Sequence, residues 1–256
     1  MLYILILLLT MCSSSLSISS DELQEIGKKI WQNECAGSIT GLTLWNAGED
    51  CASMGIGHFI WYPKNKKTEF HETFPDLLRF MEKQGKRIPA FIKKDLNLYC
   101  PWNSREDFLA ALKSPEMLEL QQFLVNTIET QVLFIEKRFN HSLEAIHKTM
   151  SDNNFNHVKK QFLRVKESPH GLYVLMDYIN FKGEGISPKE RYNNVGWGLL
   201  QVLEVMHGTS PGASAIKEFA DSAQMVLERR IKNAPPERHE ERWLAGWKKR
   251  IKTYYL

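Results

Sequence analysis

The chain has 256 residues and a formal net charge of +3, with 43% hydrophobic and 25% charged residues. This length suffices for one domain with a substantial buried core, and the composition is that of an ordinary globular protein. The weak positive charge, with no RNP, zinc-finger or P-loop pattern, argues against a nucleic-acid partner. The richer lysine and arginine content of residues 228–256 fits either a solvated helix face or a surface for an anionic polymer.

Residues 1–20 have the pattern of an export leader, and residues 21–256 are predicted to form a single domain. The apolar run from Leu2 to Thr10 is too short to span a bilayer and is typical of a signal peptide, although no lysine or arginine precedes it. The segment ending at Cys12 also resembles a lipoprotein box. We therefore expect a periplasmic or cell-envelope protein that meets the membrane only through this leader or a lipid anchor.

Three cysteines follow the leader, at positions 35, 51 and 100. An odd number cannot form a closed set of disulfides. A bridge between Cys35 and Cys51 would close a loop of about 15 residues and contribute about 3 kcal/mol on the chain-entropy model. The alternative is buried free thiols. Without a CxxC or HExxH motif, neither a metal nor another cofactor is expected.

The first predicted helix starts near Ser20 and stops at Gly37, which is a natural C-terminal cap. Ile26, Ile30 and Glu34 recur every four residues, so Glu34 shares the apolar face in the last turn. Desolvation and the negative end of the helix dipole would both raise its pKa. A glutamic acid protonated near neutral pH is what a general acid requires. The alternative is a frayed, exposed helix end.

The next segment, from Gly41 to Tyr62, is rich in glycine and in residues that favour β-structure, with a turn at residues 46–48. A small hairpin or sheet is predicted there. Further helices are predicted over residues 74–84, from the capping box at residues 104–107 onward, as one long helix after Pro115 to residue 139, and over 156–166, 170–180, 190–206, 212–231 and 237–252. The fold class is therefore α+β and mostly helical.

Polar residues gather in the turn segment: Glu49, Asp50 and Ser53 precede Gly55-Ile56-Gly57-His58. The glycines permit close approach of backbone or ligand, and His58 could bridge polar groups or be an ordinary core histidine. An acid on a helix followed by a hairpin with a second acid and a hydroxyl suits glycosidic cleavage. One carboxyl protonates the leaving oxygen, and a second group positions water or stabilises an oxocarbenium-like transition state.

These residues resemble the pattern of phage-type lysozymes: a catalytic glutamate, a hairpin aspartate, a threonine and then Gly-x-Gly-His. Two later stretches also resemble that family. "LMDYINFKGEG" with "ERYNNVGWGLLQVLEVM" is similar to its second half, and "IKNAPPERHEERWLAGWKKRI" is similar to its closing Asn-x-x-Pro-x-Arg segment and basic helix. Together the stretches cover most of the chain after residue 20, in the same order.

The resemblance implies a lysozyme-like fold, with a small β element beside a larger helical body and a cleft between them. It implies an enzyme that hydrolyses the β-1,4 glycan strands of peptidoglycan. Glu34 matches the general acid, and Ser53 stands at the threonine position, where it would hold the attacking water. The spacing would place the second acid at Ala47, so Glu49 is the first choice and Asp50 the second.

Candidates for substrate binding are His58 and, on the far wall of the groove, Asn180, Glu184, Gln201, Arg238 and Trp243; Glu184 is alternatively a loop acid. Trp61, Tyr62 and Trp102 belong either to the core or to a stacking surface for sugar rings. Two other functions stay open: a lytic transglycosylase with a single catalytic glutamate, and a non-catalytic lysozyme-like glycan-binding envelope protein. In a third, generic helical envelope protein, these residues would be scattered.

Overall fold

The computed structural model describes residues 18–64, 66, 70–94 and 97–255. Most of the predicted leader, Cys12 included, lies outside these residues. Within the described part, no helix is long and apolar enough to cross a membrane.

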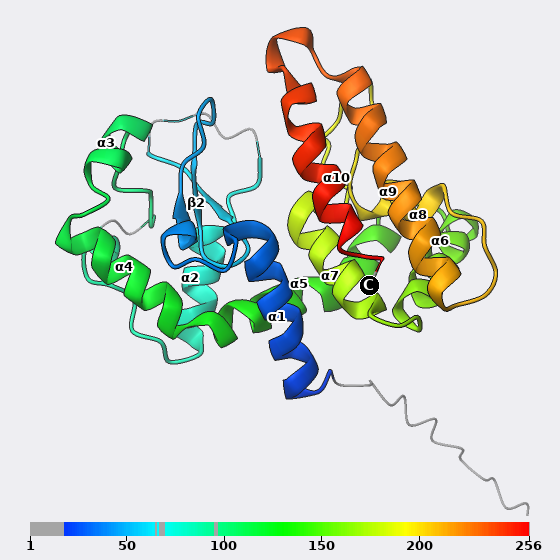
Figure 1. Cartoon of the computed structure of the whole chain (residues 1–256), viewed down its shortest axis with the longest axis horizontal. Coiled ribbons are helices and arrows are strands. Elements are labelled where there is room, and N and C mark those ends of the chain that lie inside the picture. The colour runs from blue at the N-terminus through cyan, green and yellow to red at the C-terminus, as the bar shows by residue number, and fades with distance from the viewer. Residues whose placement is uncertain (1–17, 65, 67–69, 95–96, 256) are drawn as a thin grey trace, which may run out of the picture.

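The predicted α+β class, mostly helical, is confirmed (Figure 1). The described residues form the α-helices α1 (Ser20–Cys35), α2 (Phe74–Lys83), α3 (Arg105–Ala110), α4 (Pro115–Asn126), α5 (Ile128–His147), α6 (Asp152–Lys166), α7 (Gly171–Lys182), α8 (Leu199–Glu204), α9 (Ala213–Asn233) and α10 (Leu244–Lys252). The strands are β1 (Thr43–Leu44), β2 (Ala52–Met54) and β3 (Phe59–Trp61), and the short 3-10 helices are η1 (Thr40–Leu42), η2 (Ile92–Lys94), η3 (Pro236–Arg238) and η4 (Glu240–Trp243).

The sheet is a small antiparallel meander in the order β1-β2-β3, with Ser53 opposite Ile60. Helices α2, α3 and α4 surround it and form the sheet lobe. Trp61 and Trp102 are fully or nearly fully buried there and pack edge to face, so both belong to the core. Tyr62 is also buried, but it borders the cleft described below.

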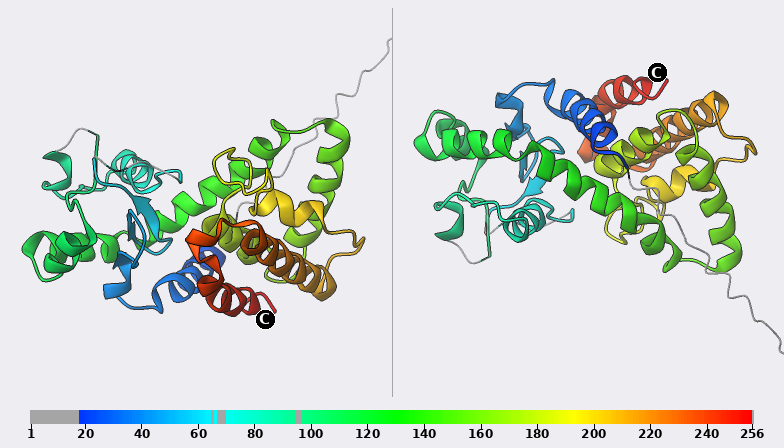
Figure 2. Two further views of the ribbon diagram at one scale, coloured as in Figure 1. Left: turned by 90° about the horizontal axis from the view of Figure 1, so that it is seen from above. Right: turned by 90° about the horizontal axis from the view of Figure 1, so that it is seen from below.

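The second lobe is helical and contains α6 to α10, with α10 packed on α9. Helix α5 extends from the sheet lobe into the helical lobe, as both views in Figure 2 show. Helix α1 packs against α5. The end of α1 is thereby held at the junction of the two lobes.

The predicted long helix after Pro115 is wrong in one respect, because the chain breaks at Thr127 into α4 and α5. The hydroxyl of Thr127 donates to the carbonyl of Phe123, and Nε2 of Gln131 donates to the carbonyl of Leu124 at 2.7 Å. Oε1 of Gln131 accepts from the backbone N–H of Ile56 at 2.8 Å. The side chain of Gln131 therefore holds the Gly-x-Gly-His turn against the junction of α4 and α5. Leu118 of α4 is 54% exposed and therefore lies outside the buried face of that helix.

The helix predicted over residues 190–206 forms only as α8. Residues before it make a turn in which Tyr192 and Val195 pair, and Asn193 and Asn194 both have positive φ. Asparagine tolerates this left-handed conformation, which a helix cannot contain.

Candidate functional site

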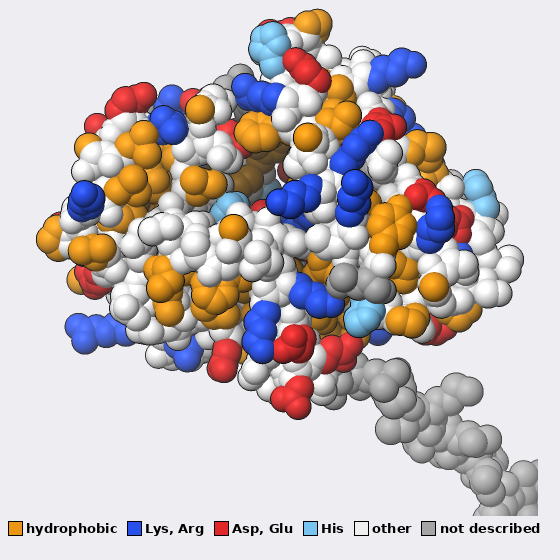
Figure 3. Space-filling view, viewed as in Figure 1, with side chains coloured by type: hydrophobic (Ala, Val, Ile, Leu, Met, Phe, Trp, Pro, Cys, Tyr) orange, Lys and Arg blue, Asp and Glu red, His pale blue; other side chains and the backbone are white. Residues whose placement is uncertain are grey.

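A cleft of about 960 Å³ separates the sheet lobe from the helical lobe, and Figure 3 shows it as a hollow near the middle of the molecule. The sheet side contributes Glu34, the loop between β1 and β2, and the turn before β3. The helical side contributes the end of α7, the loop that follows it, η3, η4 and α10. Most of the residues selected from the sequence line this cleft.

Glu34 reaches the cleft because of where α1 begins and ends. Oγ of Ser19 accepts from the backbone N–H of Glu22, which fixes the start of the helix. Ala36 and Gly37 have φ of 50° and 69° and end it in left-handed geometry. Ile30 of the same stripe is fully buried, whereas the Glu34 side chain is 14% exposed. The alternative of a frayed, exposed end therefore does not hold.

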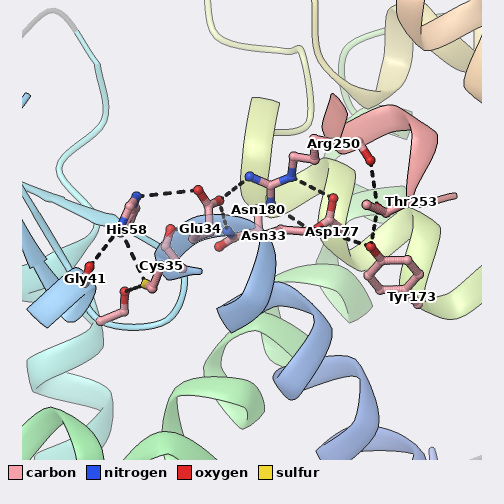
Figure 4. Close-up of polar contacts among 12 residues, drawn as sticks. Asn33, Glu34, Cys35, Gly41, His58, Tyr173, Asp177, Asn180, Arg250 and Thr253 are labelled. Carbon is pink, nitrogen blue, oxygen red and sulfur yellow. Dashed lines mark hydrogen bonds and ion pairs between the residues drawn. The ribbon is translucent and has the colours of Figure 1, made fainter. Parts of the chain in front are cut away.

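The carboxylate of Glu34 has three polar partners (Figure 4). Nη1 of Arg250 lies 2.5 Å from Oε1, and Nδ2 of Asn180 donates to the same oxygen at 3.1 Å. Nδ1 of His58 lies 3.5 Å from the other oxygen, Oε2. Glu34 thus meets a cation and an amide, in addition to the burial that its helical phase predicted.

Arg250 is held in place from behind by Asp177, which is fully buried. Nε and Nη2 of Arg250 each donate to Asp177 at 2.8 Å, and the hydroxyl of Tyr254 donates to Asp177 at 2.6 Å. Burial disfavours the charged guanidinium, but Asp177 and then Glu34 outweigh it and raise the pKa of Arg250 well above its ordinary value. Arg250 is therefore a fixed positive charge beside Glu34.

Sequence reasoning missed both residues of this pair. Asp177 stands in the apolar run "YVLMDYI", and a charge in such a run signals a buried partner. Arg250 follows Trp247 by three residues and precedes Ile251, both buried on the same face of α10. Each signal marks its residue as a buried charge in need of a partner, but neither identifies that partner.

His58 bridges polar groups, which was one of its two predicted roles. Its Nε2 lies 3.0 Å from the carbonyl oxygen of Gly41 and 3.5 Å from Sγ of Cys35. The carbonyl needs a donor, so Nε2 carries a proton and Nδ1 faces Glu34. Cys35, like Cys51 and Cys100, is a buried free thiol, and burial raises the pKa of Cys35 to about 12. The predicted alternative of a Cys35–Cys51 bridge is not formed.

The two candidate second acids differ in their surroundings. Glu49 lines the cleft and accepts from Nδ2 of Asn46 at 3.2 Å; burial raises its pKa above the ordinary value despite that hydrogen bond. The Asp50 side chain is 66% exposed and pairs with Lys66 at 2.9 Å. Ser53 is 7% exposed and borders the same cleft. Glu49 is thus the more enclosed of the two acids.

Four of the five predicted far-wall residues line the cleft: Asn180, Glu184, Arg238 and Trp243. Glu184 lies 3.7 Å from Nη2 of Arg138. Gln201 is absent from the lining and is 4% exposed. Its Oε1 accepts from Gly198 N–H at 3.0 Å and its Nε2 donates to the Gly185 carbonyl at 3.1 Å, so it braces the loop before α8.

The two lobes also meet at the mouth of the cleft. A Cβ atom added at Gly48, in the loop between β1 and β2, would lie 3.4 Å from Nη2 of Arg242 in η4. Arg242 therefore covers this loop from the helical side. Sequence reasoning selected neither residue.

Among the described residues, no group of three or more His, Cys, Asp or Glu side chains is arranged to hold a metal ion. Comparisons of the chain with protein-family models, with curated proteins and with solved structures found no match.

Proposed function

We propose that the protein is an exported glycosidase of the periplasm or cell envelope that hydrolyses the β-1,4 glycan strands of peptidoglycan. The observation that carries the proposal is the placement of Glu34: its carboxylate, at a helix end, borders a cleft between a small sheet and a helical lobe. The resemblance to phage-type lysozymes in the segment from Glu34 to His58 supports the same reading. No cofactor enters the proposed reaction.

The partners of Glu34 assign different roles to its two oxygens. Arg250 and Asn180 both donate to Oε1, so negative charge is stabilised there. The proposed reaction requires the other oxygen, Oε2, which lies 3.5 Å from Nδ1 of His58, to deliver a proton to the glycosidic oxygen. As that proton moves, the bond from C1 to the leaving oxygen breaks and an oxocarbenium-like centre develops. Arg250 then stabilises the carboxylate that remains on Glu34.

Water completes the reaction by bonding to C1 and losing a proton. We assign this water to Ser53, which borders the cleft, and its proton to Glu49, the less exposed of the two hairpin acids. A raised pKa brings a carboxylate base nearer to neutral pH, where it accepts a proton more readily.

The same raised pKa favours a second candidate, a lytic transglycosylase. Burial disfavours the ionised form of Glu49 that a base needs, and Asp50 is 66% exposed and paired with Lys66. Glu34 would then act alone, and a hydroxyl of the substrate would attack C1 in place of water. Mass spectrometry separates the two reactions, since hydrolysis leaves reducing ends and the transglycosylase leaves 1,6-anhydro ends.

The test of the proposed function is Glu34→Gln, which keeps the shape of the side chain and an oxygen for Arg250. We expect it to abolish release of soluble glycan from purified peptidoglycan. Glu25→Gln, on the exposed face of the same helix, is the matched control and should keep full activity. Survival of wall digestion in Glu34→Gln would refute the mechanism. Glycan binding without any product from the wild type would identify a non-catalytic binding protein.

A further inference from the structure

Cationic and aromatic side chains alternate in the helical lobe beside the cleft, and we call this set the cation–aromatic ladder. All of its members except Arg250 line the cleft. Its members, in spatial order, are Arg250, Phe181, Lys182, Trp247, Arg230 and Trp197. Nζ of Lys182 lies 4.0 Å from the ring centre of Phe181 and 3.9 Å from that of Trp247. Arg230 lies 5.1 Å from Trp247 and 4.0 Å from Trp197. Helices α7, α9 and α10 contribute five members, and Trp197 lies in the loop before α8.

The two arginines of the ladder each have a carboxylate. Arg250 is paired with Asp177 at 2.8 Å, and Arg230 donates to both oxygens of Glu240 at 2.6 and 2.7 Å. Lys182 differs from them. In the described part of the chain its ammonium makes neither a hydrogen bond nor an ion pair, and its side chain borders the cleft.

Aromatic rings alone do not satisfy an ammonium group. The group has three N–H donors, and a ring face offers a cation–π attraction without an oxygen acceptor. Burial lowers the pKa of Lys182 well below its ordinary value, and Arg230 and Arg250 lower it further. Glu240 and Glu34 act on this pKa in the opposite direction, but no carboxylate of the described residues contacts the ammonium, so an anionic oxygen entering the cleft would supply its missing partner.

We propose that Lys182 forms a subsite for a carboxylate carried by the substrate, held beside the aromatic rings of the ladder. The inference rests on the proposed function, because it names a chemical group on the glycan substrate. Peptidoglycan carries such a group in two places: the lactyl carboxylate of a bare glycan strand, and the carboxylates of an attached stem peptide. Either source presents the same chemistry to Lys182.

The test compares three glycan tetrasaccharides in the Glu34→Gln background, which is expected to block turnover. One has free lactyl carboxylates, the second has them as methyl esters, and the third carries stem peptides through lactyl amides. Dissociation constants are measured by calorimetry, with the tryptophans of the ladder as a fluorescence readout. We expect at least one carboxylate-bearing ligand to bind about tenfold more tightly than the ester, as for one charge-assisted contact. Preference for the first ligand assigns the lactyl group, and preference for the third assigns the stem peptide.

Lys182→Met then removes the charge and keeps an unbranched apolar stem against the rings. It should abolish the preference for the carboxylate-bearing ligand over the ester. Lys189→Met, an exposed lysine on the loop after α7, is the control and should retain the preference. Equal binding of all three ligands by protein with an intact Lys182 overturns the inference even if Lys182→Met fails to fold. That result would not affect the proposed function. Failure of the proposed function would be seen in a different experiment, as digestion of peptidoglycan by Glu34→Gln.

Discussion

Arg250 contacts Glu34 through Nη1 at 2.5 Å, while its Nε and Nη2 each donate a hydrogen bond to Asp177 at 2.8 Å. One guanidinium thus joins the end of α1 to α7 and α10 of the helical lobe. The acid proposed to act on the substrate is therefore held in position by the lobe opposite the sheet. Planar, always charged arginine suits this double pairing, and lysine would not reproduce it.

Arg250→Met should destabilise the protein by about 3–5 kcal/mol, because it leaves the fully buried Asp177 without its cation. The free energy of unfolding is measured by urea titration. Lys249→Met, an exposed position on the same helix, should change it by less than about 0.5 kcal/mol. A loss of similar size in both variants would mean that the Asp177 pair does not carry this energy.

Gly57→Ala should disturb the site through sterics alone. Its new Cβ would lie 2.6 Å from Oδ1 of Asn180 and 2.8 Å from Cζ of Phe59, closer than such atoms approach in proteins. Asn180 would have to move away from Glu34, so glycan cleavage should fall at least tenfold and stability by about 1–3 kcal/mol. Activity on purified peptidoglycan and urea unfolding report the two effects.

Gly246→Ala is the matched control, since a Cβ there meets nothing within 4 Å and the residue lies inside α10. It should raise stability by about 0.5–1 kcal/mol through helix propensity and leave cleavage unchanged. If Gly57→Ala behaved in the same way, the close packing of Asn180 on the turn would be refuted.

The sequence predicted local features well, because local signals determine them. The start and stop of α1, the small sheet and the phase of Glu34 follow from capping residues, turn residues and helical period. Long-range pairs were harder. Asp177 and Arg250 are 73 residues apart, and nothing in either local pattern names its partner. The motif favoured Arg238, which lines the cleft, while the cation at Glu34 is Arg250.

Tertiary contacts also decided where the long helical pattern after Pro115 breaks. Periodicity continues through Thr127, but Gln131 uses its side chain to bind both the end of α4 and the Gly-x-Gly-His turn. Gln201 likewise has the residue type of a ligand-binding group, yet its amide is fully engaged by the loop that it braces. Residue type alone does not distinguish a polar group that binds substrate from one that holds a loop.

The three described thiols should be unreactive in the native protein. Cys35, Cys51 and Cys100 are all buried, and burial raises the pKa of each to about 12. Only the thiolate reacts, so Ellman's reagent at pH 8 should label none of them within minutes. In a Cys12→Ser protein, guanidinium should release three reactive thiols. Fast labelling before unfolding, or fewer than three thiols after it, would contradict the buried free state.

Glu49 should make stability depend on pH in a defined direction. Burial raises its pKa above the ordinary value of 4.5, so the folded protein holds this proton more tightly than the unfolded chain. As pH rises from about 4.5 through the folded-state pKa, the folded state binds more protons than the unfolded state, and stability falls. Below this pH range, Glu49 is protonated in both states and its contribution to stability is fully present. Other raised carboxyls, including Glu72 and Glu190, act in the same direction, so a variant is needed to isolate Glu49.

Glu49→Gln provides that comparison, because the amide cannot ionise and keeps an oxygen for Asn46. The free energy of unfolding of both proteins is measured by urea titration from pH 4 to pH 7. Relative to the variant, the wild type should become less stable as pH rises, and the difference should level off once Glu49 is ionised in the folded state. Asp50→Asn retains Glu49 and should still show the fall. Parallel curves for the wild type and Glu49→Gln would mean that Glu49 is not enclosed in the cleft, and would remove the reason for preferring it to Asp50.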